Sequence, residues 1–280
     1  MRPTYSHDLE KAKEILGYKQ THTDIPEDFI EFNKFIGLPK HPATLKEQPL
    51  TAVQRGFFKE YVHPTRQCKI HLNKARQCGW TEMILRILAY HCFHKYAGGK
   101  IVIIPGTRER TTKEIFGRFK ELIKNTGKIE EEGYLYIRLS NGTEIYGEKA
   151  NPEAITGWTK IKAILMDEAA KWNLVDDTPV INAILPIVRT NKSDLFMIST
   201  PKGPRGFFYN IDMNPQSDFL KVKYDIHAAG AELYSDEERQ KMIESSEEDP
   251  AQEYLNQYTT GRNSIFGNNF KEEDYEASWA

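Results

Sequence analysis

The sequence predicts an α/β protein in which helices flank a mostly parallel, doubly wound central sheet. Two observations lead to this prediction. Short apolar runs alternate along the chain with longer segments of helical periodicity, which is the pattern of strands joined by crossover helices. Polar residues follow directly after several of the apolar runs, and such sheets bind ligands at the carboxyl ends of their strands.

Three segments are predicted: a helical extension over 1–48, an α/β core over 49–230 and a helical subdomain over 231–280. The extension carries short helices near 8–16 and 26–36. The core begins with a helix near Leu50, with Thr51 as its N-cap. The next elements of the core are a strand ahead of a loop at 74–81, a buried helix over 83–90, a strand over 100–106, an amphipathic basic helix over 108–125, strands over 134–139 and 143–146, a strand over 161–166, a helix over 179–189, a strand over 195–198 and a further strand over 221–227. Asn141-Gly142, which separates the two strands at 134–146, is a strong hairpin signal.

Composition sets broad limits on the class of protein. The chain has 280 residues, of which 39% are hydrophobic, enough for an ordinary core in one large or two small domains. No apolar run approaches the length of a membrane span, and the polar N-terminus is unlike a signal peptide, so no membrane partner is expected. The odd count of 3 cysteines suggests a reduced, intracellular chain.

The cysteines raise the question of a metal site, because histidines lie near them in the sequence. No two of them have the Cys-x-x-Cys spacing of a zinc site, and Cys78 would have to leave its loop. We therefore expect small apolar core or loop residues. The residues concerned are Cys68, Cys78, Cys92, His71, His91 and His94.

The loop at 74–81 is the stretch around which the chain is organised. Strand, loop, helix is the setting of a phosphate-binding loop, where backbone N–H groups and the helix N-terminus hold an anion. Against the usual pattern G-x-x-x-x-G-K-[ST], Gly79 takes the second glycine position and Thr81 the Mg2+-binding hydroxyl. Trp80 stands at the lysine position and Lys74 at the first glycine. A turn before a helix is the alternative interpretation of this loop.

Polar residues that could complete such a site follow two of the later strands. Asp167-Glu168 ends an apolar run, and the chemistry needs one carboxylate for Mg2+ and one to orient and deprotonate water. Ser199-Thr200 ends the next run, where hydroxyls could bond a phosphate or the attacking water. Gln54 precedes the first core strand and could read an adenine edge. Each feature alone also has a simpler interpretation. Asp167-Glu168 could merely end a strand, Ser199-Thr200 could be an N-cap or a turn, and Gln54 could be a surface glutamine.

The order of these parts is that of a P-loop ATPase of the RecA-like (ASCE) type, whose catalytic glutamate lies on its own strand, here with a β-hairpin insertion. The chain also resembles the large terminase subunits, the DNA-packaging motors of tailed viruses, from about residue 50 to about 270. The stretches that carry the resemblance are the loop at 74–81, Asn141-Gly142-Thr143, Ile164-Leu165-Met166-Asp167-Glu168-Ala169-Ala170, Ile198-Ser199-Thr200-Pro201-Lys202-Gly203, Phe207-Phe208-Tyr209 and Gln252-Glu253-Tyr254.

The resemblance implies roles for individual residues and for partners. Asp167 and Thr81 would hold Mg2+, Glu168 would activate water, and Ser199-Thr200 would couple hydrolysis to movement. Lys74 and Arg76 would neutralise phosphate charge, and Gln54 would read adenine. The loop residues expected to bind ATP are Lys74, Ala75, Arg76, Gln77, Cys78, Gly79, Trp80 and Thr81. The implied partners are double-stranded DNA, a portal protein and a small terminase subunit, with the chain in a homo-oligomeric ring on the portal in the host cytoplasm.

The chain departs from the family pattern at three points. Trp80 replaces the usual lysine, and Lys74 matches the variant with a lysine at the start of the loop. Thr156 stands where members often carry an arginine that acts on a neighbour's nucleotide, which leaves Lys160, Lys162 and Arg189 as candidates. The family also usually has a nuclease domain, and the chain ends too soon after residue 270 to contain it, so it is expected to be a truncated piece or a stand-alone motor domain.

Charge is unevenly distributed although the net charge is only −2. Residues 98–128 carry eight Lys or Arg against three Asp or Glu, and residues 232–280 carry four against thirteen. A basic face for a polyanion is one interpretation, and two solvated helix faces are the other. The candidate DNA-gripping side chains are Arg110, Lys113, Arg118, Lys120 and Lys124.

Two other functions are compatible with these motifs. A helicase-like DNA-remodelling ATPase would need a second RecA-like lobe, for which the chain is too short. A degenerate interaction subunit would keep the fold without hydrolysing ATP. The presence of Thr81, Asp167 and Glu168 together argues against such decay, since the two carboxylates have little structural use.

Overall fold

The computed structural model describes residues 24–260 except 156, 173–176 and 247–248. The helix predicted near 8–16 and Thr156 therefore lie outside the described residues. The helix predicted at 26–36 is present as α2 (Phe29–Phe35), which Asp28 caps by accepting hydrogen bonds from the backbone N–H groups of Ile30 and Glu31. Its buried Phe29 and Phe32 pack into the main hydrophobic core.

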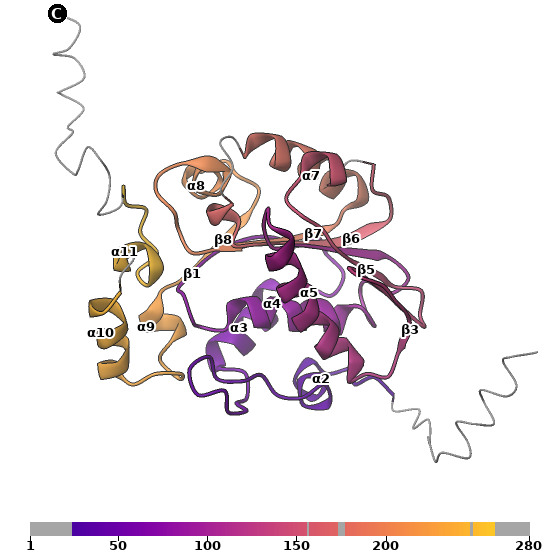
Figure 1. Ribbon diagram of the computed structural model, residues 1–280, viewed down its shortest axis with the longest axis horizontal. Coiled ribbons are helices and arrows are strands. Elements are labelled where there is room, and N and C mark those ends of the chain that lie inside the picture. Colours follow the sequence, from indigo (N-terminus) through magenta and orange to yellow (C-terminus); the bar gives the residue numbers. More distant parts are fainter. Residues whose placement is uncertain (1–23, 156, 173–176, 247–248, 261–280) are drawn as a thin grey trace, which may run out of the picture.

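Eight strands form a single mixed sheet in the order β3-β4-β5-β2-β6-β7-β1-β8 (Figure 1). The neighbours from β5 through β2, β6, β7 and β1 to β8 pair in parallel, and the hairpin strands pair antiparallel. The predicted fold class and hairpin insertion are confirmed, while β3 was not predicted. The strands are β1 (Lys69–Lys74), β2 (Lys100–Ile104), β3 (Ile129–Glu132), β4 (Tyr136–Leu139), β5 (Glu144–Gly147), β6 (Ile161–Asp167), β7 (Asp194–Ser199) and β8 (Leu220–Tyr224).

Helices cover both faces of the sheet, as Figure 1 shows, with α2, α3, α4 and α5 on one face and α7 and α8 on the other. The N-cap predicted at Thr51 is present and forms a capping box, because its side chain accepts from the N–H of Gln54 while Gln54 accepts from the N–H of Thr51. The helices are α3 (Ala52–Tyr61), α4 (Trp80–His91), α5 (Glu109–Lys124), α6 (Pro152–Ile155), α7 (Thr178–Asn191), α8 (Gly206–Met213), α9 (Ile226–Ala229), α10 (Asp236–Glu244) and α11 (Pro250–Glu253), with a 3-10 helix η1 (Ala169–Lys171).

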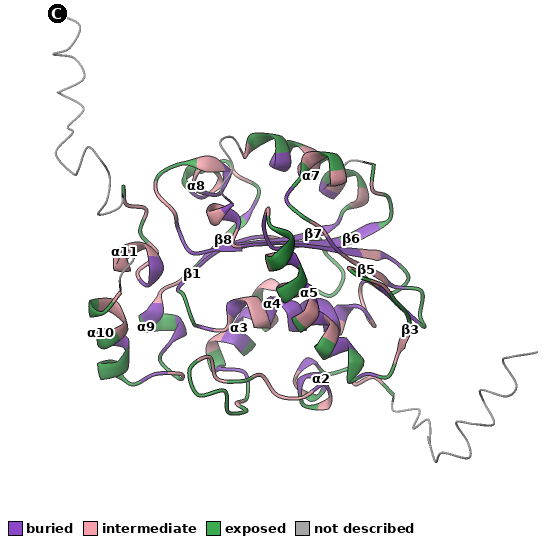
Figure 2. Ribbon diagram, viewed as in Figure 1, coloured by how far each residue is buried: buried purple, intermediate pink, exposed green. Residues whose placement is uncertain are grey.

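The sheet is buried on both faces because alternate strand residues enter two separate hydrophobic layers (Figure 2). Leu165 and Phe196 belong to the layer beneath α3, α4 and α5. Met166 and Met197, their neighbours along the same strands, belong to the layer beneath α7 and α8. Continuous apolar runs are therefore required in these strands, and they are what made the strands recognisable in the sequence.

The strand order decides which residues meet at the ligand-binding edge. β7 lies between β1, which leads into the 74–81 loop, and β6, which carries Asp167 at its end. The parallel register aligns Asn73 with Ser199 and Asp167 with Ile198. The C-terminal ends of β1, β7 and β6 therefore meet at one edge of the sheet, as predicted.

The cysteines occupy the predicted environment, because Cys68, Cys78 and Cys92 are all buried among apolar residues. Within the described ranges, no group of three or more His, Cys, Asp or Glu side chains could hold a metal ion. None of the described helices has both the length and the apolar character needed to span a bilayer.

Candidate active site

The backbone of the 74–81 loop has the shape of an anion-binding nest. Gln77 and Gly79 take left-handed conformations with φ of 60° and 72°, and α4 begins at the next residue. Successive backbone N–H groups in such a turn point into one concavity, which the N-terminus of the helix extends. A Cβ at Gly79 would lie 3.1 Å from Nε2 of Gln54, so the close approach and the positive φ both favour glycine.

Gln54 links this loop to the start of α3 through its side-chain amide. Its Nε2 donates to the carbonyl of Cys78 at 3.3 Å, while its Oε1 accepts from the backbone N–H of Thr51 at 3.0 Å. The side chain is 7% exposed. Both ends of the amide are thus hydrogen-bonded to the protein backbone. Recognition of adenine by Gln54 stays a prediction, and it would have to use the second N–H of Nε2.

Trp80 does not point its side chain at the anion site. The indole is 2% exposed and stacks on Tyr224 at a centroid distance of 4.7 Å, with Phe57 against its edge at 5.3 Å. Only its backbone is available to a ligand. Position 80, the place of the usual lysine, is therefore part of the hydrophobic core.

Lys74 brings positive charge to the site from the end of β1. Its Nζ donates to Oε1 of Glu168 at 2.5 Å, across the end of the intervening strand β7. The side chain is 6% exposed. Although burial favours its neutral form, the charges of Glu168 and Asp167 raise the pKa of Lys74 above its usual value. The residue is a buried, charged ammonium and not a solvated strand end.

Asp167 and Glu168 lie in different environments although they are adjacent. Asp167 is buried and accepts a hydrogen bond from Thr81 Oγ1 at 3.0 Å. Burial and the charge of Glu168 raise the pKa of Asp167 to about 6. For Glu168, burial favours the protonated form, but Lys74 and Lys171 hold the pKa below its usual value. Glu168 therefore remains ionised, as a group that accepts a proton must be.

The backbone at Glu168 is strained, with φ of 48° in the left-handed region. Non-glycine residues adopt this conformation when the surroundings impose it, often at active sites. Ser199 Oγ lies 3.3 Å from Glu168 Oε2 and donates to the carbonyl of Thr200 at 2.7 Å. The predicted coupling residues are thus in contact with the predicted base.

The C-terminal segment contacts the site directly, which the sequence did not indicate. The backbone N–H of Arg76 donates to the carbonyl of Glu253 at 2.8 Å, and the two side chains approach to 3.6 Å. The buried carboxylate of Glu253 also pairs with Lys171 at 2.6 Å. Tyr234 donates its hydroxyl to the carbonyl of Gln77 at 2.9 Å. The stretch Gln252-Glu253-Tyr254 was the one signal available in the sequence, and it carried no role.

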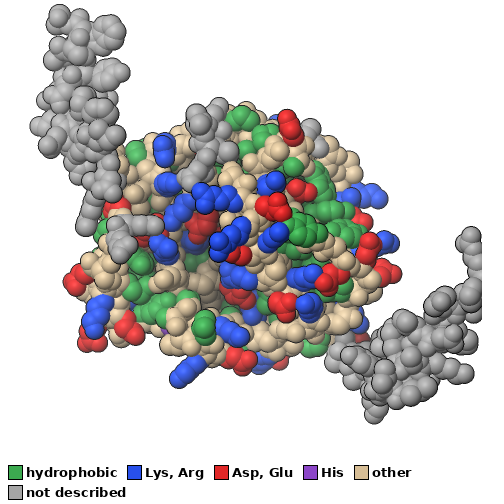
Figure 3. All heavy atoms as spheres, viewed as in Figure 1, with side chains coloured by type: hydrophobic (Ala, Val, Ile, Leu, Met, Phe, Trp, Pro, Cys, Tyr) green, Lys and Arg blue, Asp and Glu red, His purple; other side chains and the backbone are tan. Residues whose placement is uncertain are grey.

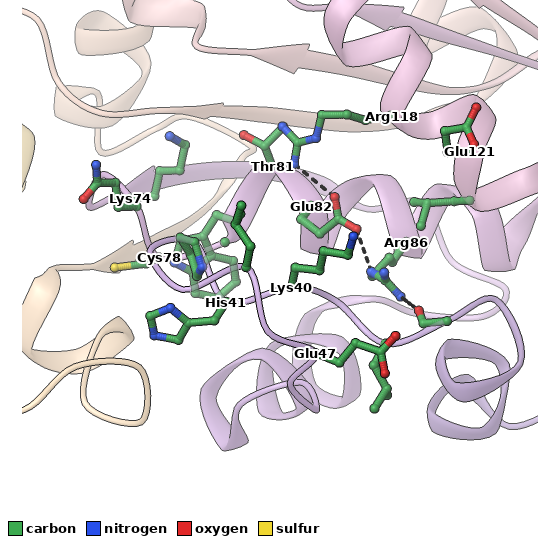
Figure 4. A pocket seen from close by; sticks show the side chains of 18 of the residues that line it. Lys40, His41, Glu47, Lys74, Cys78, Thr81, Glu82, Arg86, Arg118 and Glu121 are labelled. Carbon is green, nitrogen blue, oxygen red and sulfur yellow. Dashed lines mark hydrogen bonds and ion pairs between the residues drawn. The ribbon is translucent and has the colours of Figure 1, made fainter.

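A cavity of about 700 Å³ lies against the loop (Figure 4). Drug-sized and cofactor ligands occupy pockets of about 300–1,000 Å³. Its walls are the 74–81 loop, Glu168, the segment from Ile36 to Glu47, and a stretch of α5 that includes Arg118. The participation of α5 and of the N-terminal segment in this wall was not predicted.

The oxygen atoms at the loop fit a magnesium ion that is shared with phosphates. Mg2+ is usually held by one or two protein oxygens together with substrate phosphates and water. Thr81 Oγ1 and Asp167 Oδ1 already lie within 3.0 Å of each other beside the anion-binding nest. The raised pKa of Asp167 shows that its buried negative charge is unfavourable. A cation bound there would stabilise that charge.

Sequence comparison decides the family. The family model described as "Terminase large subunit, T4likevirus-type, N-terminal" matches residues 71–271. The chain belongs to the terminase large subunits. The predicted resemblance to this family is thereby confirmed. No curated protein matches the chain.

Solved terminase structures have the same fold. A variant of the large terminase ATPase domain of Thermus phage P74-26 is similar with a TM-score of 0.60 and 20% identity, over 82% of this chain and 98% of that one. The large terminase of bacteriophage HK97 is similar with a TM-score of 0.59 and 17% identity, over 83% and 55% of the two chains. The large terminase of a thermophilic bacteriophage, in complex with ATP-γ-S, has a TM-score of 0.59 and 12% identity, over 75% and 53%. The terminase chain described here thus spans about half the length of the latter two.

The candidates for an arginine finger lie far from the site of their own terminase chain. Lys160 and Lys162 flank the start of β6, and Arg189 lies in the last turn of α7 before β7. The site is at the opposite end of these strands, roughly 20 Å away for a strand of this length. Any of the three could reach a nucleotide only in a neighbouring subunit.

The basic helix α5 of this terminase is neutralised by its own surroundings. Figure 3 shows basic and acidic side chains intermixed over this face. Every candidate DNA-gripping cation on α5 has a carboxylate partner. The pairs are Arg110 with Glu114, Lys113 with Glu109, Arg118 with Glu82, Lys120 with Glu132 and Lys124 with Glu121. The high local count of cations in the sequence does not translate into an unpaired basic surface on this helix.

Proposed function

We propose that this chain is the ATPase motor of a viral terminase, which hydrolyses ATP to move double-stranded DNA into a procapsid. The observation that carries the proposal is the convergence of Lys74, Thr81, Asp167 and Glu168 on one anion-binding loop beside a cavity of sufficient size. The large terminase of the thermophilic bacteriophage, which has the same fold, has been solved with ADP and with ATP-γ-S. Membership of the terminase large subunits adds independent support.

Lys74 is the residue that we propose neutralises the transferred phosphate, as in the variant with a lysine at the start of the loop. Its ammonium is at the mouth of the nest and is held there by Glu168. A triphosphate in the cavity would compete with Glu168 for this ammonium, because both are anions. Nucleotide binding would therefore release Glu168 to accept a proton from water. Arg76, half exposed on the same loop, would add charge from the solvent side.

Thr81 and Asp167 are the residues that would hold Mg2+. When bound, the ion supplies charge that stabilises the phosphate oxygens during transfer. Glu168, whose ionised form Lys171 would still favour after Lys74 turns to the phosphate, would orient the water and take its proton. Ser199 and Thr200, in contact with Glu168, would transmit the change in its partners to β7.

Exchange of each acidic residue for its amide tests this division of labour. Glu168→Gln should bind nucleotide normally and lose about 10²–10⁴-fold in hydrolysis, because the amide cannot accept a proton. Asp167→Asn should instead weaken binding of nucleotide with Mg2+. Steady-state phosphate release and binding of ATP-γ-S measure the two effects.

Glu144→Gln is a matched control, since Glu144 is also partly buried and paired with a lysine, but at the start of β5 away from the loop. Hydrolysis by Glu168→Gln at the parent rate would remove Glu168 as the base. No hydrolysis by the parent, alone or with DNA and portal protein, would favour the degenerate interaction subunit.

The partners remain part of the proposal. We infer that the chain acts in a homo-oligomeric ring on a portal protein, with a small terminase subunit and double-stranded DNA, in the host cytoplasm. A motor of this kind needs to grip the phosphate backbone without reading bases. No helix cation on α5 is offered unpaired for this purpose, so the contribution of α5 is expected to be small.

A triple reversal tests that expectation. Lys113→Glu, Lys120→Glu and Lys124→Glu together should lower DNA affinity by less than about tenfold, since carboxylates already neutralise these lysines. DNA binding is measured as a function of salt concentration. A steep loss of affinity together with a smaller salt slope would instead establish α5 as the DNA-gripping helix.

A further inference from the structure

Arg118 differs from the other cations of α5 because it lines the cavity at the phosphate-binding loop. Its Nη2 donates to Glu82 Oε2 at 3.0 Å, and Glu82 directly follows Thr81 in the first turn of α4. In Figure 4 the guanidinium extends from α5 toward this end of the loop. The ion pair thus holds a positive charge next to the residues proposed to bind the metal.

The position of Arg118 is fixed by a second, buried arginine. Arg86 is 3% exposed and donates from Nε to the other oxygen of Glu82 at 2.8 Å. Arg86 is anchored in turn by Asn33 and by the carbonyl of Gly37, at 3.1 and 2.7 Å. Glu82 is therefore held in place before it binds Arg118, and the orientation of Arg118 follows from it.

The helix end of the loop lacks the cation that this type of loop usually carries, and Arg118 is placed to supply it. The loop pattern normally supplies a lysine at position 80 that reaches the β- and γ-phosphates. Here that side chain is an indole buried against Tyr224, so this end of the loop has no cation of its own. Arg118 is close enough to Asp167 for its charge to favour the ionised carboxylate.

We propose that Arg118 binds the phosphate groups of the nucleotide at the Thr81 end of the loop, supplying from α5 the cation that position 80 lacks. This inference rests on the proposed function of the same site. Lys74 would neutralise the phosphates from the strand end, and Arg118 would do so from the helix end. A guanidinium has five N–H donors, and among the described residues only Nη2 of Arg118 is engaged, so the fork can bind phosphate without leaving Glu82.

A purely structural role does not explain this arrangement. The Arg118 side chain is 46% exposed, and ion pairs at that exposure contribute little to stability. Glu82 is already paired with the buried Arg86. Removal of the Arg118 guanidinium should therefore leave the melting temperature unchanged, which makes the variant usable for binding measurements.

The test compares Arg118→Ala with Arg138→Ala. Arg138 lies on β4, is 47% exposed and is paired with Glu130 and Glu131, so it matches Arg118 in exposure and in having carboxylate partners but does not line the cavity. Arg118→Ala should weaken ATP-γ-S binding with Mg2+ by about tenfold or more, as expected for loss of a charge-assisted hydrogen bond. ADP binding should weaken less, competition by inorganic tripolyphosphate should weaken in parallel with ATP-γ-S, and Arg138→Ala should match the parent.

Each contrary outcome has a defined meaning. Parent-like affinity of Arg118→Ala for ATP-γ-S overturns the inference alone, while hydrolysis by the parent continues to support the proposed function. A parent that neither binds nor hydrolyses ATP overturns both. Loss of affinity for a double-stranded DNA fragment with unchanged nucleotide binding would assign Arg118 to DNA phosphates and likewise overturn the inference.

Discussion

The two ends of the 74–81 loop are both buried, for opposite physical reasons. At the strand end, the ammonium of Lys74 is surrounded by carboxylates and stays charged. At the helix end, the indole of Trp80 is surrounded by aromatic rings. A loop of this type needs a cation near the phosphates but does not need it at one fixed position. Under the proposed function, Lys74 supplies this cation from the strand end, where β1 directs its side chain toward the carboxylates.

Geometry explains why the lysine is at one end and the tryptophan at the other. Position 74 is the last residue of β1, at the edge where β6 and β7 also end. Position 80 is the first residue of α4, and its side chain packs against Phe57 of α3 and Tyr224 of β8. A lysine there would be a buried, unpaired charge, which is far more costly than a buried pair.

The largest effect is expected at the strand end. Lys74→Ala should reduce ATP hydrolysis by about 10²-fold or more, since it removes charge stabilisation of the transferred phosphate. Phosphate release in the presence of Mg2+ measures it. Lys69→Ala is the control, because Lys69 begins the same strand at the opposite edge and pairs with Asp218.

The melting profile of Lys74→Ala is also informative. We expect a lower melting temperature, because Asp167 and Glu168 would lose their shared counter-ion. Parent-like hydrolysis by Lys74→Ala would contradict the proposal that Lys74 takes the place of the lysine usually found at position 80. Arg76 or Arg118 would then have to supply the charge.

A smaller effect is expected at the helix end, and on stability more than on the reaction. Trp80→Lys should lower the free energy of unfolding by about 3–5 kcal/mol, the range for loss of a large buried aromatic side chain. In the Lys74→Ala background it should not restore hydrolysis, because position 80 faces the core. Urea denaturation and phosphate release measure the two effects.

Trp158→Lys provides the comparison, since Trp158 is only partly buried and should tolerate the change better. Rescue of hydrolysis by Trp80→Lys at normal stability would mean that either end of the loop can present the cation. That result would remove the distinction between the two ends.

The smallest effect concerns pH and the carboxylates that Lys74 pairs with. Asp167 has a folded pKa of about 6 against an ordinary value of 3.8, so the folded protein binds its proton more tightly. This contribution to stability is present at low pH and is lost as pH rises toward 6. Glu168, whose pKa is lowered from 4.5, acts in the opposite sense but only below that value.

The contribution of Asp167 to the free energy of unfolding should therefore fall between pH 4.5 and 6.5, by about 2 kcal/mol at most. The buried His71 and His91 act in the opposite sense over this range, because burial lowers their pKa values to about 4 and about 3, so the Asp167 contribution is measured as the difference between the parent and a variant. Asp167→Asn should therefore be more stable relative to the parent at pH 6.5 than at pH 4.5, while Asp194→Asn, a change at the start of β7 away from the loop, should keep the slope of the parent. Equal slopes for the parent and Asp167→Asn in urea titrations would show that Asp167 does not titrate in this range.

Most helices and strands, and the residues at their ends, could be predicted from local sequence patterns. The capping box at Thr51, the hairpin at Asn141-Gly142 and the buried strands depend on local patterns, because turn chemistry and hydrophobic periodicity act within a few residues. Lys74 and Asp167-Glu168 could be identified because they directly follow such runs. These signals sufficed for the fold class and for most of the loop.

The assembly of the site depends on long-range packing that local sequence patterns do not encode. The placement of β7 between β1 and β6 brings Lys74 to Glu168, which are 94 residues apart in the chain. Glu253 and Arg118 enter the site from distant segments, and the sequence assigned neither of them a role at the phosphate-binding loop. Glu82 and Glu132, both from outside α5, pair with Arg118 and Lys120, and packing placed Trp80 in the core. Each of these depends on which distant side chains meet, and that information lies in the packing of the whole chain.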